Sequence, residues 1–422
     1  MADVALETPH GRTNEFALGW PVVTACMVGM MLGISAVPFY TIGVFAGPVI
    51  ETFGWTRAQY QGAFTFMLAG AFIGPLVGHL CDKLGTRKVA LTSVTLFALS
   101  FASLGVLTQQ SIWTFYAIWA VMAFVAQGTG PIPWTRAISE WFYQQRGLAF
   151  GMALMGSGFT AFLAPPLVNA LISAAGWRLA YVIVGAGVFT IAFPVLFWGL
   201  RAAPQSVLDS GAERAQSMST RYGKTLREAL RSYRFWVIAI AFSMISLGVS
   251  GIISNLVLLL TDRGFTPQLG ALIASLVGLS VLLGRLLVGA LLDRFWGPAI
   301  AFVLMALPAS ACLMLASTEL STALTVVAVF IVGFAAGAEF DIIAYFITRY
   351  FGLKHYGKIY GVQYTIFFLG AGIAPLVFAA VYDAAQSYGP ILTAAAAMFL
   401  IAAAMLLTLG RYPNLAEPDS TP

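Results

Sequence analysis

Three ionisable side chains lie deep inside apolar stretches of the sequence. Arg285 stands eight residues before Asp293, and Glu339 and Asp341 stand ten and eight residues before Arg349. At about 1.5 Å per residue, eight helical residues place a group roughly 12 Å from the end of its helix. A charge at the centre of a bilayer costs about 2.5–3.5 kcal/mol, so each of these groups needs a partner or a function.

These groups could bind an anion and exchange a proton. The guanidinium of Arg285 can hold a carboxylate through two parallel hydrogen bonds, or it can form a structural ion pair. Glu339 and Asp341 are about 200° apart on a helix, so at most one is expected to face the centre. An acid that pairs with Arg285 could be displaced by an anionic ligand and take up a proton; alternatively, both acids neutralise Arg285 permanently.

Other candidate residues are weaker individually. Arg136 has Glu140 one helical turn later, which predicts either a structural pair or a gate. A tyrosine offers a small anion one hydroxyl donor and an apolar ring face. The polar and aromatic candidates for lining a site beside Arg285 are Phe39, Tyr40, Gln127, Asn255, Tyr345, Gln363 and Tyr364.

The composition indicates the elements that must position these groups. Of the 422 residues, 59% are hydrophobic and 9% are charged, against roughly 45–50% and 25% in soluble proteins. A lipid bilayer is the solvent that suits such a surface. The net charge of +5 is small and does not indicate nucleic-acid binding. The three cysteines are far apart, so neither a metal site nor a disulfide framework is expected.

Twelve stretches are long and apolar enough to be spanning helices. They cover 19–47, 58–80, 88–108, 112–139, 147–171, 178–200, 235–260, 269–291, 297–317, 322–348, 357–381 and 389–410. The polar N-terminus lacks the features of a secretory signal, so the first stretch is expected to remain as a span. We predict an all-α membrane protein with six-helix bundles over 1–200 and 235–422. A cytoplasmic linker with a basic amphipathic helix is predicted over 201–234.

The basic residues predict the orientation. All but five of the 22 Lys and Arg residues fall on the side of the chain termini. Arg57, Arg178 and Arg263 fall on the opposite side, and Arg136 and Arg285 fall inside spans. Because basic loops stay in the cytoplasm, both termini are expected there, in a multi-pass protein of the plasma (cell inner) membrane.

The chain repeats itself at an offset of about half its length. Gly54-Trp-Thr-Arg57 recurs as Gly264-Phe-Thr-Pro267, and Gly78-x-x-x-Asp82 recurs as Gly289-x-x-x-Asp293. An even number of spans in each copy makes the two bundles parallel in the membrane. A site between them near the midplane follows from this arrangement.

The loop after the second span resembles a motif of the major facilitator superfamily, Gly-x-x-x-Asp-x-x-Gly-x-Arg. The matching residues are Gly78, Asp82, Gly85 and Arg87, with a degraded copy at Gly289 and Asp293. The resemblance implies the major facilitator fold and a cytoplasmic gate. The candidate gate residues are Gly78, Asp82, Gly85, Arg87, Arg136, Glu140 and Asp293.

Within the superfamily, the run from 141 to 151 and Arg285-x-x-x-Gly289 are similar to the monocarboxylate porters and the oxalate/formate exchangers. The resemblance implies that Arg285 holds a substrate carboxylate. Three positions depart from these families: Phe39 replaces a family Lys, 363–370 lacks a family Lys, and Val281 replaces a family Asp. The absence of both lysines leaves Arg285 as the single obvious cation. A single cation favours a monoanion over a dianion.

The expected function is therefore secondary active transport of a small organic monoanion by alternating access, coupled to protons. The expected protein is a monomer in the lipid bilayer, not an enzyme, without a cofactor or a nucleic-acid partner. A drug or metabolite exporter is the alternative within transport. An intramembrane enzyme lacks a catalytic constellation here, and a sensor on a transporter scaffold would bind its ligand without flux.

Overall fold

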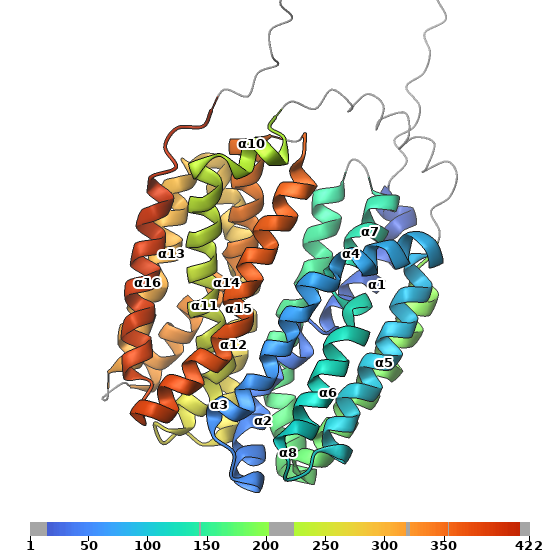
Figure 1. The fold of residues 1–422 in the computed structure, drawn as a ribbon, viewed down its shortest axis with the longest axis vertical. Helices are drawn as coiled ribbons and strands as arrows, with labels where there is room; N and C mark the ends of the chain where they lie inside the picture. Colours follow the sequence, from blue (N-terminus) through green and yellow to red (C-terminus); the bar gives the residue numbers. More distant parts are fainter. Residues whose placement is uncertain (1–14, 143–144, 202–222, 318–320, 353, 414–422) are drawn as a thin grey trace, which may run out of the picture.

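The computed structural model describes residues 15–142, 145–201, 223–317, 321–352 and 354–413. These residues form two helical bundles that lie side by side (Figure 1). The N-terminal bundle contains α1 (Glu15–Met31), α2 (Val37–Phe53), α3 (Arg57–Gly62), η1 (Ala63–Leu68), α4 (Ala69–Leu84), α5 (Thr86–Leu107), α6 (Ile112–Val125), η2 (Gln127–Thr129), α7 (Pro131–Trp141) and α8 (Arg146–Gly199). The C-terminal bundle contains α11 (Tyr233–Thr261), α12 (Pro267–Arg294), α13 (Gly297–Ala316), α14 (Thr322–Phe351), α15 (Tyr356–Ala385) and α16 (Gly389–Leu407). The short helix α10 (Leu226–Leu230) lies at one end of the molecule, which we call the α10 end (Figure 1).

The helices follow the predicted spans in order, but not every span is one straight helix. Among the described residues, eight helices are long and apolar enough to cross a membrane, and the bent pair formed by α3, η1 and α4 makes a ninth. The predicted span 19–47 is divided into α1 and α2, and 112–139 into α6, η2 and α7. Conversely, α8 runs through two predicted spans, with the non-helical Gly176 between them.

The break between α1 and α2 packs against the break in the fourth span. Gly33 lies so close to the backbone carbonyl of Thr129 that no side chain would fit between them. The N–H of Ile34 donates a 3.0 Å hydrogen bond to Oγ1 of Thr129. Backbone donors freed at a helix break need partners where water is excluded, so each break stabilises the other. The break also gives α2 its own start, with Tyr40 in its first turn.

The two copies of the internal repeat have the same local geometry. Gly54 and Gly264 both have positive φ angles, 69° and 83°, which glycine adopts without strain. Two residues later, Thr56 and Thr266 each cap a helix by accepting a hydrogen bond from the N–H three residues on. The repeat therefore places the starts of α3 and α12 in equivalent positions in the two bundles.

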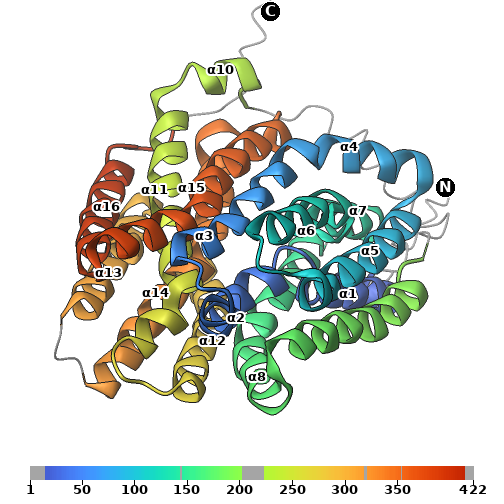
Figure 2. The same ribbon diagram turned by 60° about the horizontal axis from the view of Figure 1, so that its bottom comes forward.

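The two bundles contact each other at mid-depth and at the end opposite α10. At mid-depth α8 crosses α12, where Gly158 and Gly278 lie against each other. Towards the opposite end, Gly43 of α2 packs on the backbone of Ser254 in α11. Figure 2 shows α2 and α3 at the boundary with the C-terminal bundle, whereas the bundles diverge towards the α10 end in Figure 1.

The α8–α12 crossing predicts a difference between two glycine-to-alanine variants of the same helix. A Cβ on Gly278 would overlap the backbone of Phe162, whereas one on Gly289 would meet nothing within 4 Å. We expect Gly278→Ala to lower the melting temperature, because overpacking costs about 1–3 kcal/mol. Gly289→Ala should leave it equal or raise it, because alanine favours a helix by about 1 kcal/mol. Equal melting temperatures for the two variants would contradict this packing.

Candidate functional site

Arg285 lies near the middle of α12, about 14 Å from its last residue at 1.5 Å per residue. Its side chain is half-buried, and its Nε is buried without a hydrogen-bond partner. None of the ion pairs found among the described residues includes it. The Nε of Arg285 therefore has hydrogen-bonding capacity that the described protein atoms leave unused.

Close packing of α12 on α14 brings two acids towards this guanidinium. Gly337 of α14 lies directly against the backbone of α12, and a Cβ on Gly284 would come within 2.5 Å of a carbonyl oxygen of α14. One turn or less from these contacts, Glu339 and Asp341 both lie within electrostatic range of Arg285. Small residues thus set the distance between the helices that carry opposite charges.

The two acids differ in burial, as their spacing on the helix predicts. Glu339 is 3% exposed, and its Oε1 has no hydrogen-bond partner within the described part of the chain. Asp341 is half-buried. A buried carboxylate without hydrogen bonds keeps its charge only where a cation compensates it, so Glu339 depends on Arg285 in a way that the more exposed acid does not.

The N-terminal bundle contributes Tyr40 to the same place. Tyr40 interacts electrostatically with both Arg285 and Glu339, although it belongs to the other bundle. Its ring lies 4.9 Å from that of Phe39, centroid to centroid. Arg285, Glu339, Asp341 and Tyr40 therefore form one cluster across the boundary between the bundles.

Tyr360 of α15 joins this cluster and is not among the residues predicted from the sequence. It interacts electrostatically with Asp341 and Arg285. Tyr356, Tyr360 and Tyr364 follow each other at intervals of four, which is the spacing of one helix face. That spacing was the signal that could have found it.

Two of the predicted lining residues are engaged elsewhere as structural ties. The side-chain amide of Gln363 is buried and donates a 2.8 Å hydrogen bond to the carbonyl of Phe235 in α11. Asn255 is buried towards the end opposite α10, where its Oδ1 accepts hydrogen bonds from Tyr388 and Gln61. The structure does not bring either residue to Arg285.

Two further predicted residues have hydrogen-bond partners outside the cluster. The hydroxyl of Tyr345 lies 3.4 Å from that of Tyr412, and burial raises the pKa of Tyr412 to about 12. This contact fastens the C-terminal segment to the α10 end of α14. Gln127 donates its side-chain amide to the carbonyl of Ala123 in the same span. Both residues were predicted to line the site because of the helix they belong to. The helix alone does not determine which way a side chain points.

Three of the predicted gate residues, Asp82, Arg136 and Glu140, form a network at the α10 end. Arg136 of α7 pairs with Asp82 near the end of α4, and this pair joins the two helices. Arg136 also donates a 3.0 Å hydrogen bond to Glu140 within α7. The guanidinium of Arg87 lies 4.3 Å from the ring centre of Phe197. Gly85 has a positive φ of 84° at the turn between α4 and α5, and Gly78 lies in α4. Asp293 lies in α12, and its side chain is outside the described residues.

A second charged network closes the opposite end and was missed in the sequence. Arg57, at the start of α3, makes two 2.6 Å hydrogen bonds to Asp262 at the end of α11. The guanidinium carbon of Arg57 also lies 3.7 Å from the centroid of the Tyr382 ring. From the sequence, Arg57 contributed only to the predicted orientation of the chain in the membrane. Nothing in the sequence indicates a partner 205 residues away.

Asp383 completes this network by capping a helix of the other bundle. Its two carboxylate oxygens accept hydrogen bonds from the N–H groups of Arg57 and Ala58, at 3.2 and 2.7 Å. Tyr388 accepts from Arg57 and donates to Asn255, and burial raises the pKa of its hydroxyl. We call Arg57, Asp262, Tyr382, Asp383 and Tyr388 the Arg57 latch.

Comparison with known proteins gives a consistent result. The family model of the Major Facilitator Superfamily matches residues 23–375. Monocarboxylate transporter 13 of Bos taurus is 26% identical over 96% of this chain and 92% of its own. The oxalate:formate antiporter of Oxalobacter formigenes is 24% identical over 57% of this chain and 54% of its own. Among solved structures, a bacterial homologue of the human lysosomal transporter Spinster superimposes with a TM-score of 0.67 at 18% identity, covering 95% of this chain and 97% of that one.

The family match covers most of the chain, and the two helical bundles have the matching fold. Members of this family are transporters rather than enzymes, which agrees with the expectation from the sequence. This chain belongs to the Major Facilitator Superfamily and is a membrane transporter.

Proposed function

We propose that the protein carries a small organic monoanion of the monocarboxylate type by alternating access, together with a proton. The observation that supports this most directly is Arg285, a half-buried guanidinium without an ion-pair partner among the described residues. It lies at the boundary of the two bundles, near Tyr40 of the other bundle. The printed functions of the relatives named above, a monocarboxylate transporter and an oxalate:formate antiporter, are compatible with this class of substrate.

We further propose that the α10 end faces the cytoplasm in the plasma membrane. The excess of Lys and Arg on the side of the chain termini supports this orientation. The Arg57 latch then lies at the external surface, and the form described here is closed to the outside. Substrate would reach Arg285 from the cytoplasm in this form.

The charges of the cluster support the proposed proton coupling. Without substrate, Arg285 compensates the negative charge of Glu339 or Asp341. A bound substrate carboxylate pairs with the guanidinium in place of the acid. The charge of Glu339 or Asp341 is then uncompensated in a poorly hydrated place. Protonation of that acid removes the free-energy cost of a buried, uncompensated charge. By linkage, substrate binding and proton binding then favour each other to the same extent.

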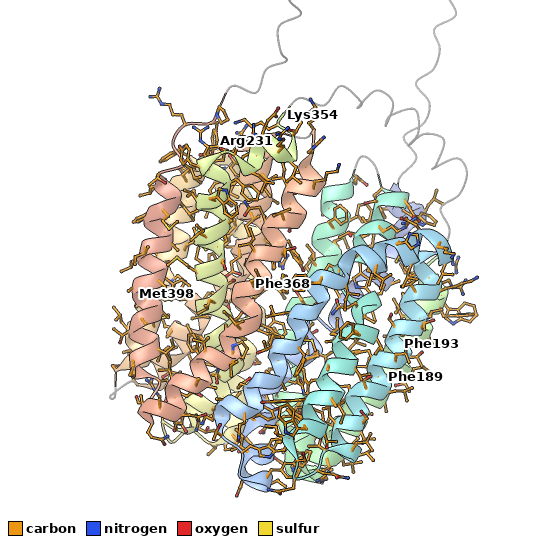
Figure 3. The ribbon with its side chains drawn as sticks, viewed as in Figure 1. Phe189, Phe193, Arg231, Lys354, Phe368 and Met398 are labelled. Atoms are coloured by element: carbon orange, nitrogen blue, oxygen red, sulfur yellow. The ribbon has the colours of Figure 1, made fainter. Side chains whose placement is uncertain are left out.

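The proposal is tested by the thermal stability of the purified protein with small carboxylates. A ligand at a hundred times its dissociation constant stabilises the folded state by about 2.7 kcal/mol. We expect at least one monocarboxylate to raise the melting temperature of the wild type and not that of Arg285→Ala. The control is Arg231→Ala, an exposed arginine at the α10 end (Figure 3), which should keep the response. Stabilisation by a neutral sugar or a cation, unchanged in Arg285→Ala, would overturn the proposal.

A further inference from the structure

Four aromatic side chains form a continuous ladder along one face of α15. The ring centroids of Tyr356, Tyr360, Tyr364 and Phe368 are 5.8, 6.1 and 4.4 Å apart in that order. Interplanar angles of 21° and 28° show that the three tyrosine rings are stacked, whereas Phe368 is tilted by 43° against Tyr364. The spacing of four residues puts successive rings on neighbouring turns, so that the ladder runs from the α10 end towards mid-depth.

The ladder faces the boundary between the bundles. Figure 3 shows Phe368 where α15 faces the N-terminal bundle. One turn further on, Gly372 packs directly on Leu68 of that bundle. At the level of the charged cluster, the ladder contributes Tyr360, which lies within electrostatic range of Arg285.

Further aromatic rings pack around Tyr40 in the N-terminal bundle and around Tyr364 in the C-terminal bundle. In the N-terminal bundle, the ring of Phe39 lies 4.9 Å from that of Tyr40 and 5.7 Å from that of Phe64. In the C-terminal bundle, Phe340 stands between the two acids in sequence, and its ring lies 5.7 Å from that of Tyr364. Tyr40 of one bundle and Tyr360 of the other thus lie within electrostatic range of the guanidinium, and further aromatic rings pack beside them.

The hydroxyls of Tyr40, Tyr360 and Tyr364 are available to a ligand. Tyr350 and Tyr116 elsewhere in the protein donate to backbone carbonyls at 2.8 and 2.6 Å. No hydrogen bond within the described ranges engages the hydroxyl of Tyr40, Tyr360 or Tyr364. These tyrosines are half-buried, so that each presents a ring and a free donor rather than a completed structural contact.

We infer that the substrate is an aromatic monocarboxylate, with its carboxylate on Arg285 and its ring between Phe39 and Tyr40 on one side and Tyr360 on the other. The inference rests on the proposed function and narrows its substrate class. Aromatic pairs add attraction beyond the area that they bury. We therefore expect benzoate to bind roughly tenfold more tightly than cyclohexanecarboxylate, which has a similar size and no π-system.

The test is calorimetric titration of the full-length protein with benzoate, phenylacetate, cyclohexanecarboxylate, acetate and oxalate. Tyr360→Leu and Phe39→Leu should each weaken benzoate binding about tenfold or more and leave acetate binding within twofold of wild type. Phe189→Leu is the matched control, because Phe189 lies on the outer face of the N-terminal bundle (Figure 3), is 39% exposed and should affect no ligand.

The outcomes separate this inference from the proposed function. If acetate or cyclohexanecarboxylate binds as tightly as benzoate through Arg285, the aromatic substrate class is wrong and the carboxylate site remains. The same holds if Tyr360→Leu weakens all ligands equally, since that indicates a packing role. If no carboxylate binds, or if Arg285→Ala binds all of them normally, the proposed function fails as well.

Discussion

Replacing Arg57 with alanine should open the end of the molecule opposite α10. The two 2.6 Å hydrogen bonds to Asp262 cross the boundary between the bundles, and the side chains are only 15% and 28% exposed. Removing one partner of such a charged pair leaves the other without compensation, at a cost of about 1–3 kcal/mol here. The population closed at this end should then fall by roughly 5- to 150-fold relative to the open one.

Spin labels report this change directly. Cysteines at the exposed positions Glu51 and Ala384, one in each bundle, give the distance across this end. The native cysteines are buried. We expect a longer distance to become populated in Arg57→Ala, and Arg57→Lys to lie between it and wild type, because lysine keeps the charge without the two-bond geometry.

The effect must come from the contact between bundles and not from the loss of any arginine. Arg178 is the control: it lies at the same end but bonds to the carbonyls of Gly105 and Thr108 within its own bundle. Arg178→Ala should leave the distance distribution as in wild type. Asp262→Asn should add little to Arg57→Ala, because the pair acts as one unit. If the effects of Arg57→Ala and Asp262→Asn are additive, or if neither variant changes the distance, the latch does not hold this end closed.

The sequence predicts the membrane helices and their order, because hydrophobicity decides whether a segment lies in lipid. It does not reveal the division of the first span at Gly33. That break depends on Thr129, which offers a hydroxyl to a freed N–H from a distant position. Apolar residues continue through the break, so the hydropathy of 19–47 reads as one helix. Contacts between residues distant in sequence thus determine where a span breaks, which composition alone does not.

The candidate site was predictable where a charge had to be buried. Arg285, Glu339 and Asp341 are conspicuous because each is costly at its depth, and the structure brings the three together. Uncharged candidates such as Asn255 and Tyr345 carry no such cost. Each has a structural partner that only the rotation of its helix reveals. The same uncertainty hid Tyr360, whose neighbours in space come from α12 and α14.

Replacing Glu339 with glutamine should abolish the accumulation of substrate driven by a pH gradient. One proton carried with each monoanion lets a gradient of one pH unit sustain about a tenfold concentration ratio. Glutamine cannot exchange a proton, so the ratio should fall to about one, while exchange of labelled for unlabelled substrate continues. Of the two acids, Glu339 is expected to have the larger effect, because it is 3% exposed and has an oxygen without a partner in the described structure.

Uptake into vesicles at several pH gradients distinguishes the acids. Asp341→Asn should retain part of the accumulation, since this half-buried group can be hydrated. Glu51→Gln, at an exposed position at the end of α2, should retain all of it. If both Glu339→Gln and Asp341→Asn accumulate substrate as wild type does, neither acid carries the proton. Arg285 would then be compensated permanently, and the driving ion would enter elsewhere.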